Sequence, residues 1–279
     1  MPAWKQDVSC LVPDYDVQQL NKKMKLKDKN GFVLPELHLS SLPTGAVKKL
    51  VDTLGKRITN GEYKIGNKIP MEPALVEEHG VSRTVVREAI KVLSGKGMVR
   101  TARRYGTQVC SIEEWNLLDP DVISWHKPDS PMARKIFIDA TRFRLMIEPP
   151  CAAMAAEMAN DLQRETIMTA AAQMNDSSVD SHAIAADFAF HATILEASGN
   201  LMLGQFRGFL HAILQFTYST KPIVLKDTEL ARQLHMAVAQ SINDGDEQLA
   251  AENMHTMLSI NADFASELAV GEAPLAARM

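Results

Sequence analysis

The stretch Val81-Ser82-Arg83-Thr84-Val85-Val86-Arg87-Glu88-Ala89-Ile90 decides the fold of the N-terminal part of the chain. Ser82 can cap a helix, because a serine hydroxyl accepts a hydrogen bond from an N–H group of the first helical turn. Gly80, just before it, favours the left-handed conformation that often ends a helix. A helix that follows Pro70, a short turn and a second helix after Ser82 together predict a helix-turn-helix motif.

The residues on either side of this stretch complete a compact unit. Residues 46–59 carry apolar side chains at helical spacing, which predicts an amphipathic helix. Residues 97–101 and 106–109 predict two strands, joined by the basic turn Ala102-Arg103-Arg104-Tyr105. The sequence therefore predicts a winged helix-turn-helix over residues 43–110.

Basic and hydroxyl side chains occupy the positions from which such a motif reaches DNA. A recognition helix enters the major groove by its N-terminal end, where Arg binds guanine with two hydrogen bonds and Ser or Thr suits phosphate oxygens. A solvated basic helix would explain any single Arg, but the ordered set favours DNA. The expected contacts are Ser82, Arg83, Thr84 and Arg87 from the helix, and Arg103, Arg104, Tyr105 and Gly106 from the wing.

Charge and cysteine content limit the classes of function. Residues 1–110 carry a net charge of +8 and residues 111–279 one of −12, within a total of −4. We therefore expect only the first part to meet a polyanion. The three scattered cysteines (Cys10, Cys110 and Cys151) favour a reducing cytoplasm over a disulfide framework. We expect neither a membrane span nor a secretory leader, since no long apolar run and no apolar segment in residues 1–29 occurs.

Helical periodicity dominates the acidic part, and the predicted fold class is mainly α. An N-terminal winged helix-turn-helix (α+β) is joined to a C-terminal all-helical antiparallel bundle. The predicted divisions are a flexible arm over 1–42, the winged domain over 43–110, a linker over 111–130, the helical domain over 131–270 and a tail over 271–279.

Several motifs resemble those of one family of regulators. Ile69-Pro70, residues 81–89, Gly97-Met98-Val99 and Gly106-Thr107 resemble the winged domain of the GntR family. Residues 115–125 resemble the linker of its FadR subfamily, especially of members that sense sugar acids, and residues 144–149 resemble the first helix of that subfamily's FCD effector domain. The resemblance spans roughly residues 43–265. It implies a ligand-responsive repressor of a catabolic operon, released from operator DNA by a small organic acid; paired half-sites imply a homodimer.

Two positions of the winged domain depart from the family pattern. Pro73 follows Glu72 where relatives usually have an Arg, so one phosphate contact is in doubt. The wing reads Arg104-Tyr105-Gly106 where relatives usually have Gly-Arg-Gly. We therefore expect an unusual operator.

Asp187, His191 and His235 are the candidate metal ligands. Asp187 and His191 are four residues apart and share a helical face, and one carboxylate with imidazoles suits Zn, Ni or Mn. By spacing alone, a surface pair or a satisfied core histidine is the better interpretation. The resemblance to FCD domains, however, implies that these positions ligate a metal.

The family's third histidine falls on Met257 in this chain. A thioether is a poor ligand for these ions, and His255, two residues away, is rotated by about 200° around the helix. Two hypotheses stay open. Either the three groups hold a metal in a weakened site, or the metal is lost and they bind the effector directly.

Arg144 is the candidate for binding the effector's carboxylate. It lies on a largely apolar helix, and the family resemblance assigns its counterpart this role, which a planar guanidinium suits. A salt bridge to Glu148, four residues on, is the alternative. Asn200 is either a polar residue of the binding site or a helix cap. The effector set is thus Arg144, Asp187, His191, His235 and Asn200.

A metal-dependent hydrolase and an architectural DNA binder are the alternatives to a regulator. An Asp/His/His metal with open positions also suits a metal-dependent hydrolase, although no nucleophile or general base at convincing spacing accompanies the set. An architectural DNA binder would bind without sequence preference and without a ligand. We expect no enzyme.

Overall fold

The computed structural model describes residues 26–27, 33–34, 42–102, 104–128, 130–173, 181–219 and 228–270. Arg103, the predicted tail and most of the predicted arm lie outside this part of the chain. The chain divides into two compact units, Met1–Leu37 and His38–Met279. In the first unit, β1 (Leu26–Lys27) pairs antiparallel with β2 (Val33–Leu34), a pairing that the sequence did not predict.

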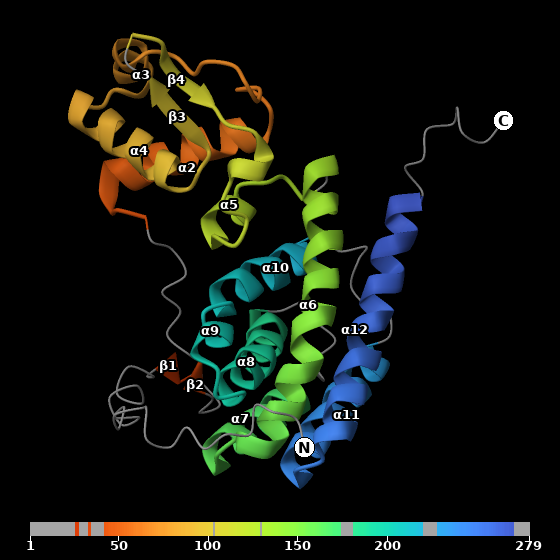
Figure 1. The fold of residues 1–279 in the computed structure, drawn as a ribbon. Coiled ribbons are helices and arrows are strands. Elements are labelled where there is room, and N and C mark those ends of the chain that lie inside the picture. Colours follow the sequence, from red (N-terminus) through yellow and green to blue (C-terminus); the bar gives the residue numbers. More distant parts are fainter. Residues whose placement is uncertain are drawn as a thin grey trace, which may run out of the picture. The chain divides into compact units, whose positions relative to one another are not determined.

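The winged helix-turn-helix forms as predicted (Figure 1). Its elements are α2 (Gly45–Thr59), α3 (Glu72–His79), α4 (Arg83–Gly95), β3 (Val99–Ala102) and β4 (Gly106–Val109). Gly80 ends α3 with a φ of 62°, and the Ser82 hydroxyl accepts a hydrogen bond from the Val85 N–H at 3.3 Å. Both signals that defined the motif in the sequence therefore act as expected.

The core of this domain explains why the recognition helix is held in place. Leu54, Leu75, Val86, Ala89 and Leu93 are completely buried and bring α2, α3 and α4 together. Burial of each large side chain contributes roughly 1.5–3 kcal/mol. The opposite face of α4, with Arg83 and Arg87, is exposed.

The segment after the wing packs into the same core. It contains a 3-10 turn, η1 (Ile112–Glu114), and α5 (Pro120–Ser124), and it buries Trp115, Val122 and Trp125 against the winged domain. The Trp125 ring covers Gly55 so closely that any side chain at that position would clash with it, and the Trp125 indole N–H donates to Asp52 at 3.0 Å. Residues predicted as a linker are thus an ordered continuation of the winged domain.

Lys96 fastens this segment to the end of the recognition helix. Its side chain is 5% exposed, and its ammonium donates to Asp119 at 2.6 Å and to Asp121 at 2.8 Å. It also lies 5.8 Å from the centre of the Trp125 ring. On the other side of α5, Ile123 belongs to a separate apolar cluster with Ile136 and Ile213 of the helical domain.

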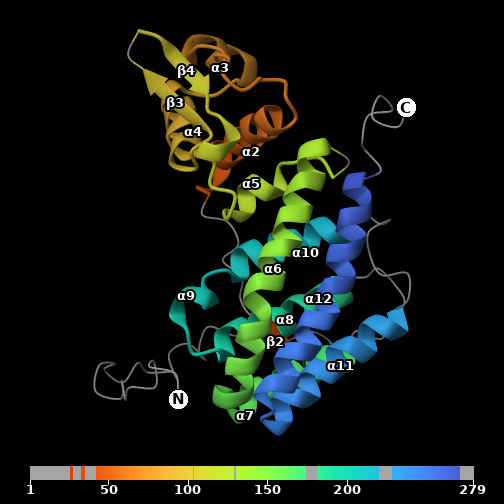
Figure 2. The ribbon, with the colours of Figure 1, turned by 45° about the vertical axis from the view of Figure 1, so that its right-hand side comes forward.

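The rest of the chain is helical, as predicted (Figure 2). The helices are α6 (Pro131–Met158), α7 (Asp161–Ala172), α8 (Ser181–Ala197), α9 (Leu201–Gly204), α10 (Arg207–Ser219), α11 (Thr228–Asp244) and α12 (Glu247–Val270). In both views α6 and α12 run side by side, with α8 and α11 packed around them. None of the described helices is both long and apolar enough to cross a bilayer.

Arg164 of α7 ties the C-terminal ends of two other helices together. Its guanidinium donates to the carbonyls of Ala156 and Ala159 at the end of α6, and to those of Ile242 and Asn243 at the end of α11. The last carbonyls of a helix have no partner within the helix, and a cation there is also favoured by the helix dipole. The contact fixes where α6 and α11 end, and these two helices carry candidate site residues.

Replacing Lys96 with methionine should lower the free energy of unfolding by about 3–5 kcal/mol, because Asp119 and Asp121 would remain buried without a cation. Lys91→Met is the matched control, since Lys91 forms an exposed pair with Glu88. The control should cost less than about 1 kcal/mol. Chemical denaturation measures both, and equal stability of the two variants would contradict the assigned role of Lys96.

Candidate functional site

Most of the predicted DNA-contacting residues that the structure describes are exposed. Ser82, the N-cap of α4, and Arg83, Thr84 and Arg87 of its first two turns are exposed, and so are Arg104 and Tyr105 at the tip of the wing. Arg104 adopts a φ of 68° and Gly106 one of 87°, so both fit the left-handed positions of a tight turn. Arg103 lies outside the described residues, and its predicted role stays a prediction.

Arg87 is held by a residue that the sequence did not single out. Its Nε donates to Glu72 Oε2 at 2.8 Å, across the turn between α3 and α4. Glu72 therefore limits the rotamers of a recognition-helix arginine that is itself well exposed. The pair occupies the region where Pro73 departs from the family pattern.

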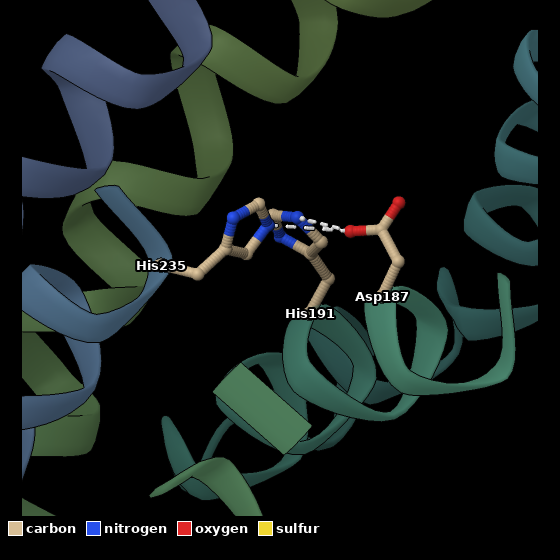
Figure 3. Close-up of side chains that lie close together, drawn as sticks. All are labelled: Asp187, His191 and His235. Carbon is tan, nitrogen blue, oxygen red and sulfur yellow. Dashed lines mark ion pairs between the residues drawn. The ribbon is translucent and has the colours of Figure 1, made fainter. Parts of the chain in front are cut away.

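The second site is a buried cluster of ionisable groups in the helical domain (Figure 3). Asp187 and His191 lie on α8 and His235 lies on α11, and their side chains point toward one another. One Asp187 oxygen, Oδ1, lies 3.3 Å from His191 Nε2 and 3.4 Å from His235 Nε2. All three residues are buried, and their ligand atoms lie within 4.8 Å of one another. The structure thus brings together the three residues predicted as metal ligands.

Arg144 and Glu148 of α6 extend this cluster. The predicted alternative for Arg144 is present: its Nε donates to Glu148 Oε1 at 2.5 Å. Arg144 Nη2 also lies 3.0 Å from His191 Nε2, and Glu148 Oε2 lies 2.6 Å from His191 Nδ1. Arg144 is therefore both the salt-bridge partner of Glu148 and a neighbour of the three candidate ligands.

Neighbouring oxygens indicate which nitrogen of each imidazole faces the cluster. His235 Nδ1 lies 2.6 Å from the Ala231 carbonyl oxygen, so it carries the hydrogen and donates. His191 Nδ1 lies 2.6 Å from Glu148 Oε2 as an ion-pair contact, which favours a hydrogen on Nδ1 in that ring as well. In a neutral ring the lone pair then belongs to Nε2. Both Nε2 atoms converge on Asp187 Oδ1, which is also an acceptor. Such an arrangement is stabilised by a cation between the groups, either a proton or a metal ion.

The electrostatics of the cluster agree with this interpretation. Burial raises the pKa of Glu148, but Arg144 and His191 outweigh burial and lower that pKa to about 2. Burial likewise opposes ionisation of Asp187, whose pKa is nevertheless held below its ordinary value by His191 and His235. Burial lowers the pKa of His191, but Glu148 and Asp187 reverse the effect and leave this pKa above its ordinary value. The cluster therefore holds two carboxylates as anions.

These donors fit a divalent cation. They comprise one carboxylate oxygen and two imidazole Nε2 atoms, of which His235 Nε2 is buried without a hydrogen-bond partner among the described residues. Glu148 and the Ala231 carbonyl are the outer hydrogen-bond acceptors that usually orient histidine ligands. The donor types suit Zn, Ni or Mn.

The position of Met257 is consistent with its predicted place in the cluster. Asn253 of α12 donates to the Ala237 carbonyl and to Ser241 of the antiparallel helix α11. One turn further along α12, Met257 is buried at the level of α11 that includes His235. His255 is exposed and contacts Ser259, so it points away, as expected.

Asn200 has a structural role. Its side chain accepts a hydrogen bond from the Met202 N–H at 2.9 Å and caps α9, which was the second of the two sequence interpretations. Sequence reasoning missed the roles of Glu72 as partner of Arg87 and of Glu148 as partner of His191. Pair spacing on one helix reveals only contacts within that helix, whereas both of these contacts join different helices.

A winged helix-turn-helix followed by an all-helical domain with a buried cluster of ionisable groups is typical of a DNA-binding regulator with a sensing domain. Comparison with known families agrees: the profile of the bacterial regulatory proteins of the GntR family matches residues 46–109, and that of the FCD domain matches residues 139–259. The chain belongs to the GntR family and carries an FCD domain.

Two relatives from Escherichia coli strain K12 match most of the chain. The uncharacterized HTH-type transcriptional regulator YieP is 34% identical over 202 residues, covering 71% of this chain and 86% of YieP. The galactonate operon transcriptional repressor is 29% identical over 216 residues, covering 76% of this chain and 93% of the repressor.

A solved structure supports the fold. Lar, which controls expression of the Listeria monocytogenes agr system, superposes with a TM-score of 0.56 at 16% identity, covering 81% of this chain and 99% of Lar.

Acid should destabilise the helical domain through His211 of α10. Burial lowers the pKa of His211 to about 4, and its ring contacts the edge of Phe188. Because this folded-state pKa lies below the ordinary value of 6.5, the unfolded chain binds the proton first as the pH falls from neutrality. At pH 5 this linkage should cost about 2 kcal/mol.

Denaturation at neutral pH and at pH 5 measures this effect, and His211→Gln should lose about 2 kcal/mol less than the unsubstituted protein between the two conditions. His255→Gln, which removes an exposed imidazole, is the control. An identical loss in all three proteins would contradict the role of His211.

Proposed function

We propose that the protein is a repressor whose winged domain binds operator DNA and whose helical domain binds a small carboxylate that releases it. The observation that carries this proposal is the convergence of Asp187, His191 and His235 beside the buried guanidinium of Arg144. A DNA-binding domain alone would not require buried, charged side chains in a second domain, since they are costly unless paired or used.

We assign the DNA-binding step to exposed residues of α4 and the wing. Arg83 and Arg87, on the first two turns of α4, would contact base edges, and Ser82, Thr84 and Arg104 would contact phosphates. Two copies of the chain related by two-fold symmetry would place two such surfaces on a palindromic site. The galactonate operon transcriptional repressor offers a precedent of the proposed kind.

Charge arithmetic favours a cation in the sensing site. With neutral imidazoles, Arg144, Glu148 and Asp187 sum to one negative charge, and a proton on His191 brings the sum to zero. Neither state provides the net positive charge that attracts a carboxylate. Asp187, His191 and His235 would hold a divalent ion, which when bound supplies the positive charge that a carboxylate needs. Arg144 would then bind that carboxylate through a guanidinium N–H, with Glu148 keeping the guanidinium oriented.

A change in affinity for DNA requires that the ligand stabilise one arrangement of the protein over another. Arg144 lies next to Phe143, which packs on Phe209 of α10, and Phe209 belongs to the same apolar cluster as Ile123 of α5. Since α5 is fastened to the recognition helix through Lys96, a shift of α6 on ligand binding reaches the DNA-binding surface by direct contacts. By linkage, DNA and ligand then weaken each other's binding.

The alternative of a metal-dependent hydrolase is not favoured. The relatives that match most of the chain are named as transcriptional regulators. A hydrolase would also leave the winged domain unexplained. Turnover of a sugar acid by the purified protein would favour the enzyme.

Sequence-specific DNA binding is tested with an operator selected from random duplexes by the full chain. Arg83→Ala should weaken binding by about 1–3 kcal/mol and relax the preference at one base pair. Lys135→Ala, which removes an exposed lysine of α6, should leave the affinity unchanged. Equal affinity of the unsubstituted protein for all duplexes would contradict a specific regulator and support an architectural binder.

Metal and ligand binding are tested by calorimetry with Zn²⁺ and by thermal-shift screening of sugar acids with and without Zn²⁺. Asp187→Asn should abolish Zn²⁺ binding, and Met257→His should strengthen it by roughly ten-fold or more by adding a ligand. Asp139→Asn on the exposed side of α6 is the control. A carboxylate at 100 times its dissociation constant should add about 2.7 kcal/mol. Stabilisation by a carboxylate that Zn²⁺ does not affect would instead support direct binding without a metal.

A further inference from the structure

The tip of the wing carries an aromatic side chain that the fold does not use. Tyr105 is 70% exposed, and its only ring contact among the described residues is with the ammonium of Lys68, 6.0 Å from the ring centre. The Tyr105 N–H donates to the Ala102 carbonyl at 3.0 Å. The ring itself packs against no apolar side chain among the described residues, so it adds little to the stability of the wing.

Lys68 reaches the wing because its own segment runs beside β4. Ile69 N–H donates to the Thr107 carbonyl and Val109 N–H donates to the Asn67 carbonyl, both at 2.9 Å, with Lys68 opposite Gln108. The ammonium of Lys68 is exposed, and no carboxylate of the described residues lies within ion-pair distance of it. A lysine held next to an aromatic ring, without an acidic partner there, is available to a phosphate.

The same segment connects the wing to the recognition helix. After Ile69, the chain passes through Pro70 to Glu72, which binds Arg87. Residues 68–72 thus contact both the wing, through Lys68 and Tyr105, and the recognition helix, through Glu72 and Arg87. Where this wing departs from the family pattern, at Tyr105, the ring lies beside the ammonium of Lys68.

We propose that Lys68 and Tyr105 form a paired contact with operator DNA, in which Lys68 binds a backbone phosphate and the Tyr105 ring lies against the wall of the minor groove. The inference rests on the proposed DNA-binding function. An aromatic ring adds apolar and stacking contact without neutralising a phosphate, whereas the ammonium neutralises one. The proposed pair thus comprises one charged and one uncharged contact. Only the charged contact should make the DNA affinity depend on salt concentration, so a salt titration distinguishes the two.

The test measures affinity of the full chain for its selected operator over a range of KCl concentrations. Lys68→Gln should weaken binding to all duplexes alike and reduce the slope of log K against log[KCl] by about 0.9. Tyr105→Ala should weaken binding roughly ten-fold with the slope unchanged. Tyr105→Arg should steepen the slope by about 0.9, because it introduces a phosphate-binding charge. Lys135→Gln is the matched charge control and should not change the slope.

The outcomes separate this inference from the function on which it rests. If the unsubstituted protein shows no sequence-selective binding, the proposed function fails. If it binds selectively but Tyr105→Ala and Lys68→Gln bind with the same affinity and slope, only the paired contact is overturned. A Tyr105→Ala variant that keeps its DNA affinity but changes its oligomeric state also overturns it, because the ring would then serve a protein interface.

Discussion

The buried charges on α6, α8 and α11 impose the strictest constraint on the helical domain. Glu148 and Asp187 are carboxylates inside an apolar bundle, and each ionises there only because Arg144, His191 and His235 surround them. An unpaired charge in such a place costs several kcal/mol, so the three helices must keep the spacing at which these groups meet. The site is therefore also a condition for how the bundle packs, and a ligand that alters the charge balance acts directly on that packing.

The winged domain also contains a buried charge that needs partners. Lys96 is as deeply buried as Arg144, but its two carboxylate partners come from the segment that continues the wing. This pairing ties α5 to the end of the recognition helix, and Ile123 packs in the apolar cluster of α6 and α10. A buried ion pair thus joins the segment to the winged domain, and apolar contacts join it to the helical domain. Such a division suits an element that transmits a change of position.

Local signals in the sequence were sufficient for the elements of the winged domain but not for the contacts between elements. Ser82 and Gly80 act on neighbouring backbone atoms, so the boundaries of the motif could be predicted, and the Asp187–His191 pair followed from helical spacing. The convergence of His235 on that pair came only from the family resemblance, since it depends on how α11 packs. The Glu72–Arg87 and Glu148–His191 contacts were not predicted. A single sequence does not show whether a glutamate on a helix faces solvent or a partner on another helix.

This chain departs from the family pattern in both domains. Met257 and Tyr105 each stand where the family resemblance leads us to expect a histidine or an arginine. At Met257 a thioether replaces the expected imidazole, so Asp187, His191 and His235 remain as the candidate ligands. At Tyr105 the ammonium of Lys68 lies 6.0 Å from the centre of the ring. Under the proposed function, the first change leaves the metal site one ligand short, whereas in the second a neighbouring segment supplies the phosphate-binding charge.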